Sequence, residues 1–131
     1  ILYIDPPYNS RQYAPNYHLL ESIAIWDKKL KNSKSGLRDY ETQKSEFCSK
    51  NKAINAFKNL IINAKCKHIL LSYNTEGIIP YKNIIEILSN KGEVKVYKKI
   101  YRRFKSNSNG GAPESPLAEL LFYCKVFNSE N

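Results

Sequence analysis

Several features that define particular classes of protein are absent or scarce in this sequence. Methionine does not occur, glycine occurs only five times, and no apolar run approaches the ~20 residues of a membrane-spanning helix. No signal peptide opens the sequence. The three cysteines, Cys48, Cys66 and Cys124, are widely spaced and odd in number, so they fit neither a disulfide framework nor a zinc site. These absences favour a protein that works in a reducing cytoplasm.

Acidic residues are also scarce relative to basic ones. The 12 Asp and Glu residues stand against 21 Lys and Arg residues, which gives a formal net charge of +9. Such an excess predicts an anionic partner, most simply nucleic acid. A lysine-rich composition inherited from the coding sequence explains the charge equally well, and both explanations stay open. The arginines are the more informative basic positions: Arg11, Arg38, Arg102 and Arg103.

The first eight residues contain the candidate site. An apolar, strand-forming run from Ile1 to Ile4 ends at Asp5, and two prolines and Tyr8 follow. Proline cannot donate to the hydrogen-bond ladder of a central strand, so the strand is expected to stop here. Ligands and catalytic groups of parallel α/β sheets collect at the carboxyl ends of the strands. Taken alone, Asp5-Pro6-Pro7-Tyr8 also fits a plain strand end and turn.

Helical periodicity predicts two helices in the next part of the chain. The first runs from Asn16, which would cap it, to about Asp27. A second begins near Ser49 and keeps a strong apolar pattern as far as Ala64. Residues 28–46 lack periodicity and are expected to form a loop with a short helical turn, so that 9–46 is an excursion from the sheet. The expected buried stripe of the first helix is Leu19, Leu20, Ile23 and Trp26.

Strand patterns dominate the second half of the chain. Residues 67–73 form a short apolar run that predicts a central parallel strand buried on both faces. The segments expected after it are a helix opened by Pro80 and stopped by Gly92, a strand at 93–104, a flexible loop at 105–116, a last strand at about 118–127 and a disordered tail.

The order of these elements predicts the fold class. Two strand–helix–strand connections imply a parallel sheet with right-handed crossovers. The last two strands are joined without a helix, so they are expected to pair as an antiparallel hairpin. The predicted class is therefore α/β, with parallel strands and a closing antiparallel hairpin, in a single partial domain that spans residues 1–131.

Three motifs stand in register with this arrangement. Asp5-Pro6-Pro7-Tyr8 follows the first strand, residues 71–77 (Leu-Ser-Tyr-Asn-Thr-Glu-Gly) follow the next, and residues 101–105 (Tyr-Arg-Arg-Phe-Lys) lie on the penultimate one. Together with residues 9–13 and 16–18, they resemble the Dam-type (D12 class) N6-adenine DNA methyltransferases, particularly the methylases of type IIS restriction systems. The resemblance implies the carboxyl-terminal half of a class I, Rossmann-like methyltransferase sheet.

The same resemblance implies an activity and its partners. The reaction would be methyl transfer from S-adenosylmethionine to an adenine flipped out of double-stranded DNA, without a metal, in the cytoplasm and at the nucleoid of a prokaryote. This family binds the donor mainly through a Phe-x-Gly-x-Gly loop that precedes the catalytic motif, and this chain contains no such loop. The implied partners are therefore DNA, the missing amino-terminal half of the methyltransferase and the cognate restriction endonuclease system.

The catalytic residues implied by the resemblance are Asp5, Pro6, Pro7 and Tyr8. The Asp5 carboxylate and the Pro6 carbonyl would each accept one N–H of the adenine amine and direct its lone pair at the methyl group. Tyr8 would stack on the flipped base. Asp5 would also touch the donor, most of whose site lies outside this chain. The candidate DNA-binding residues are Arg11, Asn74, Arg102, Arg103 and Lys105.

Two questions remain open at this level. An inactive remnant that acts only as a DNA-binding or interaction module would show the same motifs, and methylation of an RNA or protein amine is a weaker third possibility. The first strand also lacks one neighbour, and an open strand edge invites pairing. We expect the 11–46 excursion to cover this edge, or a homodimer to form through it.

Overall fold

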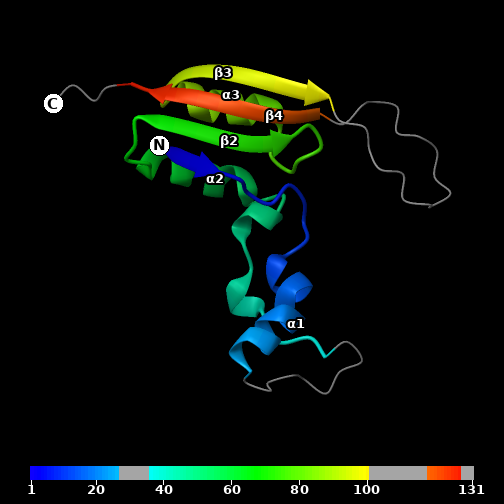
Figure 1. Ribbon diagram of the computed structural model, residues 1–131. Coiled ribbons are helices and arrows are strands. Elements are labelled where there is room, and N and C mark those ends of the chain that lie inside the picture. Colours follow the sequence, from blue (N-terminus) through cyan, green and yellow to red (C-terminus); the bar gives the residue numbers. More distant parts are fainter. Residues whose placement is uncertain (27–35, 101–117, 128–131) are drawn as a thin grey trace, which may run out of the picture.

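Four strands form one mixed sheet in the computed structural model, which describes residues 1–26, 36–100 and 118–127. The strand order is β1-β2-β4-β3 (Figure 1). β1 runs parallel to β2, and β4 is antiparallel to both of its neighbours. The predicted α/β class with an antiparallel closing hairpin is confirmed. The strands are β1 (Leu2–Ile4), β2 (His68–Asn74), β3 (Gly92–Ile100) and β4 (Ala118–Val126).

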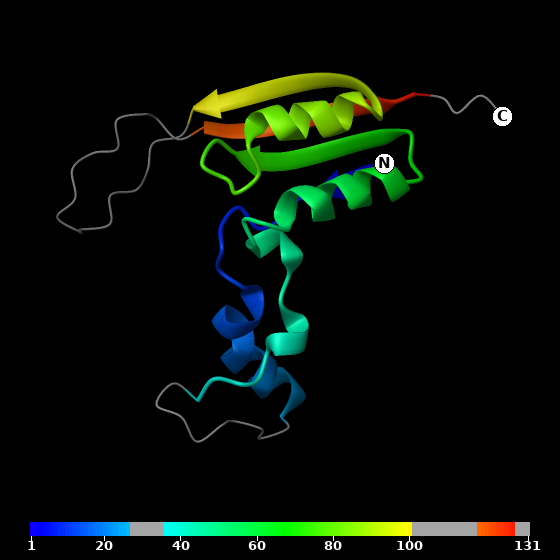
Figure 2. The ribbon, with the colours of Figure 1, turned by 180° about the vertical axis from the view of Figure 1, so that it is seen from behind.

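Two helices, α2 (Ala53–Asn63) and α3 (Tyr81–Ser89), lie side by side on one face of the sheet (Figure 2). The described residues place no helix on the opposite face, which Figure 1 shows from the front. Burial consequently alternates along β2 and β4. The expectation that β2 is buried on both faces is therefore wrong. The core between helices and sheet includes Phe57, Ile61, Ile69, Leu71, Ile84, Leu88, Phe122 and Cys124.

The two helices follow the predicted apolar patterns, but Gly92 has a different role from the expected one. α3 ends at Ser89, and Gly92 is the first residue of β3. A Cβ atom at Gly92 would lie 2.1 Å from the carbonyl oxygen of Lys125 on β4. Glycine is thus required for the close approach of two strands and not as a helix stop.

A helical arm extends away from the sheet (Figures 1 and 2). It consists of helix α1 (Tyr13–Ile25) and two 3₁₀ turns, η1 (Glu41–Gln43) and η2 (Glu46–Cys48). The short helical turn expected within 28–46 is confirmed by η1. Asn16 does not cap α1, because the helix begins at Tyr13 and Gln12 occupies the N-cap position.

The predicted buried stripe of α1 is exposed. Leu19 and Leu20 are 56% and 62% exposed, and Ile23 and Trp26 are 57% and 69% exposed. Ser22 is the only buried residue of the helix. The stripe was expected to pack because its spacing is that of a core helix. In the described structure α1 lies beyond the reach of the sheet, so no core covers these side chains.

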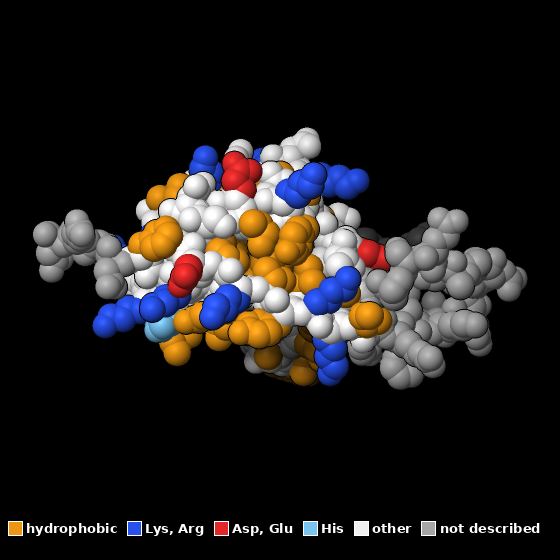
Figure 3. Space-filling model, turned by 90° about the horizontal axis from the view of Figure 1, so that it is seen from above, with side chains coloured by type: hydrophobic (Ala, Val, Ile, Leu, Met, Phe, Trp, Pro, Cys, Tyr) orange, Lys and Arg blue, Asp and Glu red, His pale blue; other side chains and the backbone are white. Residues whose placement is uncertain are grey.

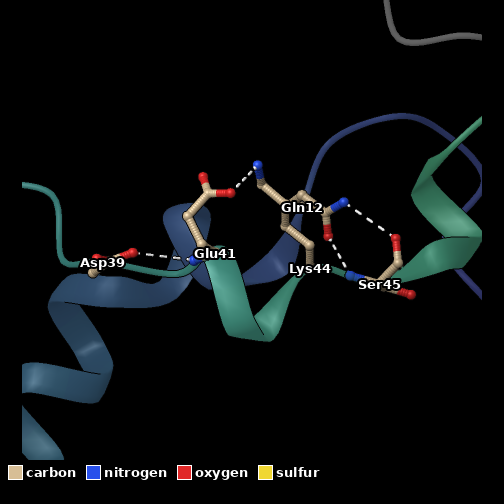
Figure 4. A network of polar contacts seen from close by, with 5 residues as sticks. All are labelled: Gln12, Asp39, Glu41, Lys44 and Ser45. Atoms are coloured by element: carbon tan, nitrogen blue, oxygen red, sulfur yellow. Dashed lines mark hydrogen bonds and ion pairs between the residues drawn. The ribbon is translucent and has the colours of Figure 1, made fainter.

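Polar contacts hold the arm together, and the pair between Gln12 and Ser45 joins its two chain segments (Figure 4). The Gln12 side chain donates to the Ser45 carbonyl at 3.2 Å, and its oxygen accepts from the Ser45 backbone N–H at 2.8 Å. Lys44 contacts Glu41 at 2.7 Å. The backbone N–H of Glu41 also donates to Asp39 at 3.2 Å. This pairing fixes the chain that leaves the Asp5–Tyr8 motif against the chain that enters α2.

One edge of the sheet stays open. Among the described strands β1 pairs only with β2, and Ile1 and Tyr3 are 86% and 60% exposed. The described part of the 11–46 excursion extends away from this edge and does not cover β1, so the other alternative, a homodimer formed through this edge, stays a prediction. The expected flexible loop at 105–116 and the disordered tail at 128–131 lie outside the described residues. No helix within the described ranges is both long and apolar enough to cross a membrane.

Candidate active site

The Asp5–Tyr8 motif lies at the carboxyl edge formed by two parallel strands. Ile4, the last residue of β1, pairs with Leu71 on β2. This register places the loop after β1 beside Ser72, the next residue of β2. The Tyr8 hydroxyl donates to Asp5 Oδ1 at 2.7 Å and also lies 3.1 Å from Ser72 Oγ. A carboxylate, a phenol and a serine hydroxyl therefore form one connected chain at this edge.

The end of β2 and the loop after it hold Tyr8 in place. The rings of Tyr8 and Tyr73 meet edge to face, with centroids 5.2 Å apart and an interplanar angle of 80°. The backbone N–H of Ile78 donates to the Tyr8 carbonyl at 3.0 Å. Tyr73 is itself fixed, because it is 1% exposed and its hydroxyl accepts from the Ile79 N–H at 3.0 Å. A Cβ atom on Gly77 would lie 2.1 Å from the Tyr73 ring, so only glycine leaves room for that ring.

Tyr8 is protonated at neutral pH, as any tyrosine is, and burial extends this range upward. Burial raises the pKa of the phenol to about 12; the hydrogen bond with Ser72 opposes this rise, and the bond to Asp5 adds to it. Near neutral pH Tyr8 is thus a hydrogen-bond donor toward Asp5. Asp5 is exposed, and its second carboxylate oxygen has no hydrogen-bond partner within the described part of the chain. That oxygen is available to an incoming N–H donor.

A cleft of about 310 Å³ opens beside this network. Two other hollows, of about 550 Å³ and 480 Å³, lie at residues 62–67 with 91 and 126–127, and between α1 and residues 38–43. Neither contains Asp5 or Tyr8, so the cleft at the carboxyl edge is the candidate active site. Its lining comprises Asp5, Pro6, Pro7, Tyr8, Asn9, Arg11, Tyr13 and Asn16.

Residues 1–87 match the family model of the D12 class N6 adenine-specific DNA methyltransferases. This chain belongs to that family. The predicted membership of the D12 class is thus confirmed, and the match includes the whole of the cleft described above. S-adenosylmethionine is the usual methyl donor of such a methyltransferase family.

The chain is also similar to several larger methylases. It is 47% identical to the type II methyltransferase M.FokI of Planomicrobium okeanokoites, over 94% of this chain and 19% of the relative. Identity to M.NlaIII of Neisseria lactamica is 45%, over 82% of this chain and 31% of that protein. Identity to the modification methylase StsI of Streptococcus sanguinis is 43%, over 94% and 19% respectively. The chain therefore spans about a fifth to a third of the length of these relatives. No solved structure matches it.

The predicted DNA contacts of this D12 chain have different positions relative to the cleft. Arg11 lies on its lining, with its backbone N–H bonded to Asn9 Oδ1 at 2.9 Å. Asn74 ends β2, where its side chain accepts from the Glu76 N–H at 3.0 Å and shapes the turn. The structure thus brings Arg11, but not Asn74, to the cleft. Arg102, Arg103 and Lys105 lie outside the described residues.

Basic side chains do not form one continuous patch on the β3 side of the molecule. Figure 3 looks onto this edge and shows lysine and arginine side chains separated by hydrophobic ones. Lys95, Lys98 and Lys99 are exposed on β3, the edge strand opposite β1. Lysines on an edge strand also discourage pairing with other sheets. This face therefore gives no support to the view that all of the excess charge serves nucleic-acid binding.

No glycine belongs to the described lining of the cleft, and the space beside Gly77 is filled by the Tyr73 ring. The described residues also contain no cluster of three or more His, Cys, Asp or Glu side chains that could hold a metal ion.

Sequence reasoning missed one residue of the network. Ser72 was noticed only as part of a polar loop, and it is half-buried with its hydroxyl on Tyr8. The available signal was its position directly after the apolar run of the neighbouring strand. Only the β1–β2 register, which the sequence does not specify, shows that this position faces the Asp5–Tyr8 motif.

Proposed function

We propose that this chain supplies the methyl-acceptor side of a site-specific DNA adenine-N6 methyltransferase of a restriction–modification system. The observation that carries the proposal is the Asp5–Tyr8 network at the carboxyl edge of the sheet, in a chain of the D12 family. The names of the relatives as type II methylases support the restriction–modification context.

The reaction first requires that the acceptor amine of adenine be made more nucleophilic. The exocyclic nitrogen of adenine is a poor nucleophile because its lone pair is delocalised into the ring. The free oxygen of Asp5 accepts one of its N–H bonds and the Pro6 carbonyl accepts the other. These bonds favour a pyramidal nitrogen and stabilise the positive charge that develops as the methyl group arrives. Asp5 need not be a strong base, because the nitrogen becomes acidic only after transfer.

The adenine must reach the cleft from within a duplex. Extrusion of the base costs a few kcal/mol, and stacking on an aromatic face returns roughly 1–3 kcal/mol. Tyr8 offers this face at the cleft. Arg11 on the same lining is placed to contact a phosphate beside the flipped nucleotide.

The donor is held mainly by polypeptide outside this segment. S-adenosylmethionine supplies an electrophilic methyl group, and Asp5 is the residue of this chain nearest to the transfer. Two observations support a second part of the protein: the cleft lining has no glycine, and the relatives carry most of their length outside the matched region. Alone, these 131 residues are expected to be inactive.

The test is substitution of Asp5 in the complete methyltransferase. Asp5→Ala and Asp5→Asn should lower methyl transfer to adenine by roughly 10²–10³-fold, the range for loss of one preorganised electrostatic partner. Incorporation of labelled methyl groups into N6-methyladenine measures this, and a gel-shift assay should show that DNA binding is retained. Glu86→Ala removes an exposed carboxylate from α3 and is the matched control. Turnover preserved in Asp5→Ala rules out the proposed mechanism.

A second measurement tests the division of the donor site. Calorimetric titration of this chain alone with S-adenosylmethionine should show no binding in the micromolar range. The same titration in the presence of the remaining methyltransferase polypeptide should show binding. Micromolar affinity of the isolated chain contradicts the proposal that the donor is held elsewhere.

A further inference from the structure

We propose that Ser72 is a positioning residue, which orients the Asp5 carboxylate through the hydroxyl of Tyr8. This inference rests on the proposed function, because it names a further residue of the same site. It also changes the part assigned to Tyr8, whose hydroxyl acts on Asp5 in addition to the contact of its ring with a base. Three features support the inference: the directions of the hydrogen bonds, the fixed position of Tyr8 and the effect of Tyr8 on Asp5.

The direction of the hydrogen bonds is fixed by the number of protons. A phenol has one proton, and the shorter contact, 2.7 Å to Asp5 Oδ1, has a carboxylate that can only accept. The Tyr8 proton is thus directed at Asp5. The 3.1 Å contact between Tyr8 and Ser72 then requires Ser72 Oγ to donate to the phenol oxygen. A bond donated to a hydroxyl oxygen polarises the O–H group and strengthens the bond that this group donates.

Tyr8 is held more rigidly than Asp5. Tyr8 contacts the end of β2 through Ser72 and the edge-to-face ring of Tyr73, and it contacts the loop after β2 through the Ile78 N–H. The phenol oxygen cannot move toward another position without breaking one of these contacts. Asp5 itself is exposed and follows a short strand. The carboxylate therefore takes its orientation from the better-fixed tyrosine.

The fixed position of Tyr8 limits the orientations of the Asp5 carboxylate. Oδ1 accepts from Tyr8 and Asp5 lines the cleft, so the second carboxylate oxygen is left for the adenine amine expected there. Without Ser72, the phenol can rotate and its bond to Asp5 weakens. The carboxylate then samples orientations in which neither oxygen meets the amine. Misplacement of a reacting group by a fraction of its contact distance lowers the rate even though binding is retained.

The first experiment measures the orientation of the Asp5 carboxylate in the 131-residue chain, and it does not depend on enzyme activity. Carbon-13 NMR of the Asp5 carboxyl group should show a shifted and broadened resonance in Ser72→Ala and in Tyr8→Phe, and no further change in the double variant. Ser72→Thr keeps a hydroxyl and should restore the wild-type resonance. The control is Thr75→Ala, three residues further along and just after β2, whose hydroxyl accepts from the Ala118 N–H and does not contact Tyr8. It should leave the Asp5 resonance unchanged.

The second experiment measures turnover in the complete methyltransferase. Ser72→Ala should lower kcat about fivefold to tenfold, the equivalent of one net hydrogen bond, with KM for DNA changed less than about twofold. Tyr8→Phe keeps the ring and should lose a similar factor. The double variant should be no slower than Tyr8→Phe, because Ser72 acts only through the phenol, and Ser72→Thr should recover most of the rate.

The outcomes separate the two proposals. If wild-type enzyme does not methylate adenine, the proposed function fails, and the NMR comparison still decides whether Ser72 positions Asp5. If the enzyme is active, an unchanged Asp5 resonance in Ser72→Ala overturns the inference alone. Rate losses that multiply in the double variant overturn it as well, since they would show that Ser72 acts independently of Tyr8.

Discussion

The sheet with its two helices and the projecting arm differ in how they bury apolar side chains. On α2, Phe57 and Ile61 are 0% and 1% exposed, because β1 and β2 and the adjacent α3 cover them. On α1, side chains of the same kind at the same helical spacing are more than half exposed. The arm is instead held by polar contacts such as the Gln12–Ser45 pair. Helical amphipathicity therefore identifies an apolar face but does not show whether a partner covers it.

The largest effect is expected from the core of the sheet region. Phe57→Ala removes a fully buried ring and should lower the free energy of unfolding by about 3–5 kcal/mol. Leu60→Ala on the same helix is the control, since Leu60 is 38% exposed, and it should cost about 1 kcal/mol or less. Urea unfolding followed by circular dichroism measures both. Equal losses would show that α2 has no buried face distinct from its exposed one.

A smaller and local effect is expected at the base of the arm. Gln12→Ala removes two hydrogen bonds to the Ser45 backbone and should make opening of the arm easier by about 1 kcal/mol. Hydrogen exchange should show faster exchange in α1 and η2, with the slowest amides of β2 and β4 unchanged. If those sheet amides accelerate equally, arm and sheet open as one unit and the comparison between them breaks down.

The contact between Tyr8 and Asp5 should make the stability of the wild-type chain depend on pH more strongly than that of Tyr8→Phe. The folded-state pKa of Tyr8 is raised from 10.0 to about 12. Between these values the folded chain holds a proton that the unfolded chain has lost. The stability contributed is therefore complete below pH 10 and disappears as the pH rises toward 12. Tyr8→Phe should lose stability less steeply than wild type in this window. Identical slopes in parallel urea titrations would show that the Tyr8 hydroxyl is not buried at the Asp5 junction.

The smallest effect is expected on the exposed stripe of α1. Ile23→Ala should change the free energy of unfolding of this chain by no more than about 0.5 kcal/mol, because Ile23 is 57% exposed. Ile61→Ala on α2 is the matched control, with the same residue type at 1% exposure and an expected loss of about 2–5 kcal/mol. A loss above about 2 kcal/mol at Ile23 would show that the stripe is packed in solution.

The sequence was sufficient to predict structure wherever the interacting residues are near each other in the chain or follow a simple period. The strands near Ile1, His68 and Ala118, the apolar face of α2 and the position of Asp5 at a strand end were all predicted. The sequence could not reveal which faces are covered, so the burial of the α1 stripe and of both sides of β2 was predicted wrongly. It also could not give the register between β1 and β2, on which the contact between Tyr8 and Ser72 depends.

The position of β4 constrains the order in which this sheet can be built. β4 is the last of the described strands along the chain, yet it lies between β2 and β3, and it pairs with β3 over its full length and with β2 over residues 119–125. A nascent chain on the ribosome that has not yet reached Val126 can pair β1 with β2 and place α2 and α3, but its sheet has a gap at the centre. Leu120, Phe122 and Cys124 complete the core only when this strand emerges. Formation of the complete sheet therefore waits for β4 itself to be synthesised, and the long-range pairings of this central strand are expected to be the slow step.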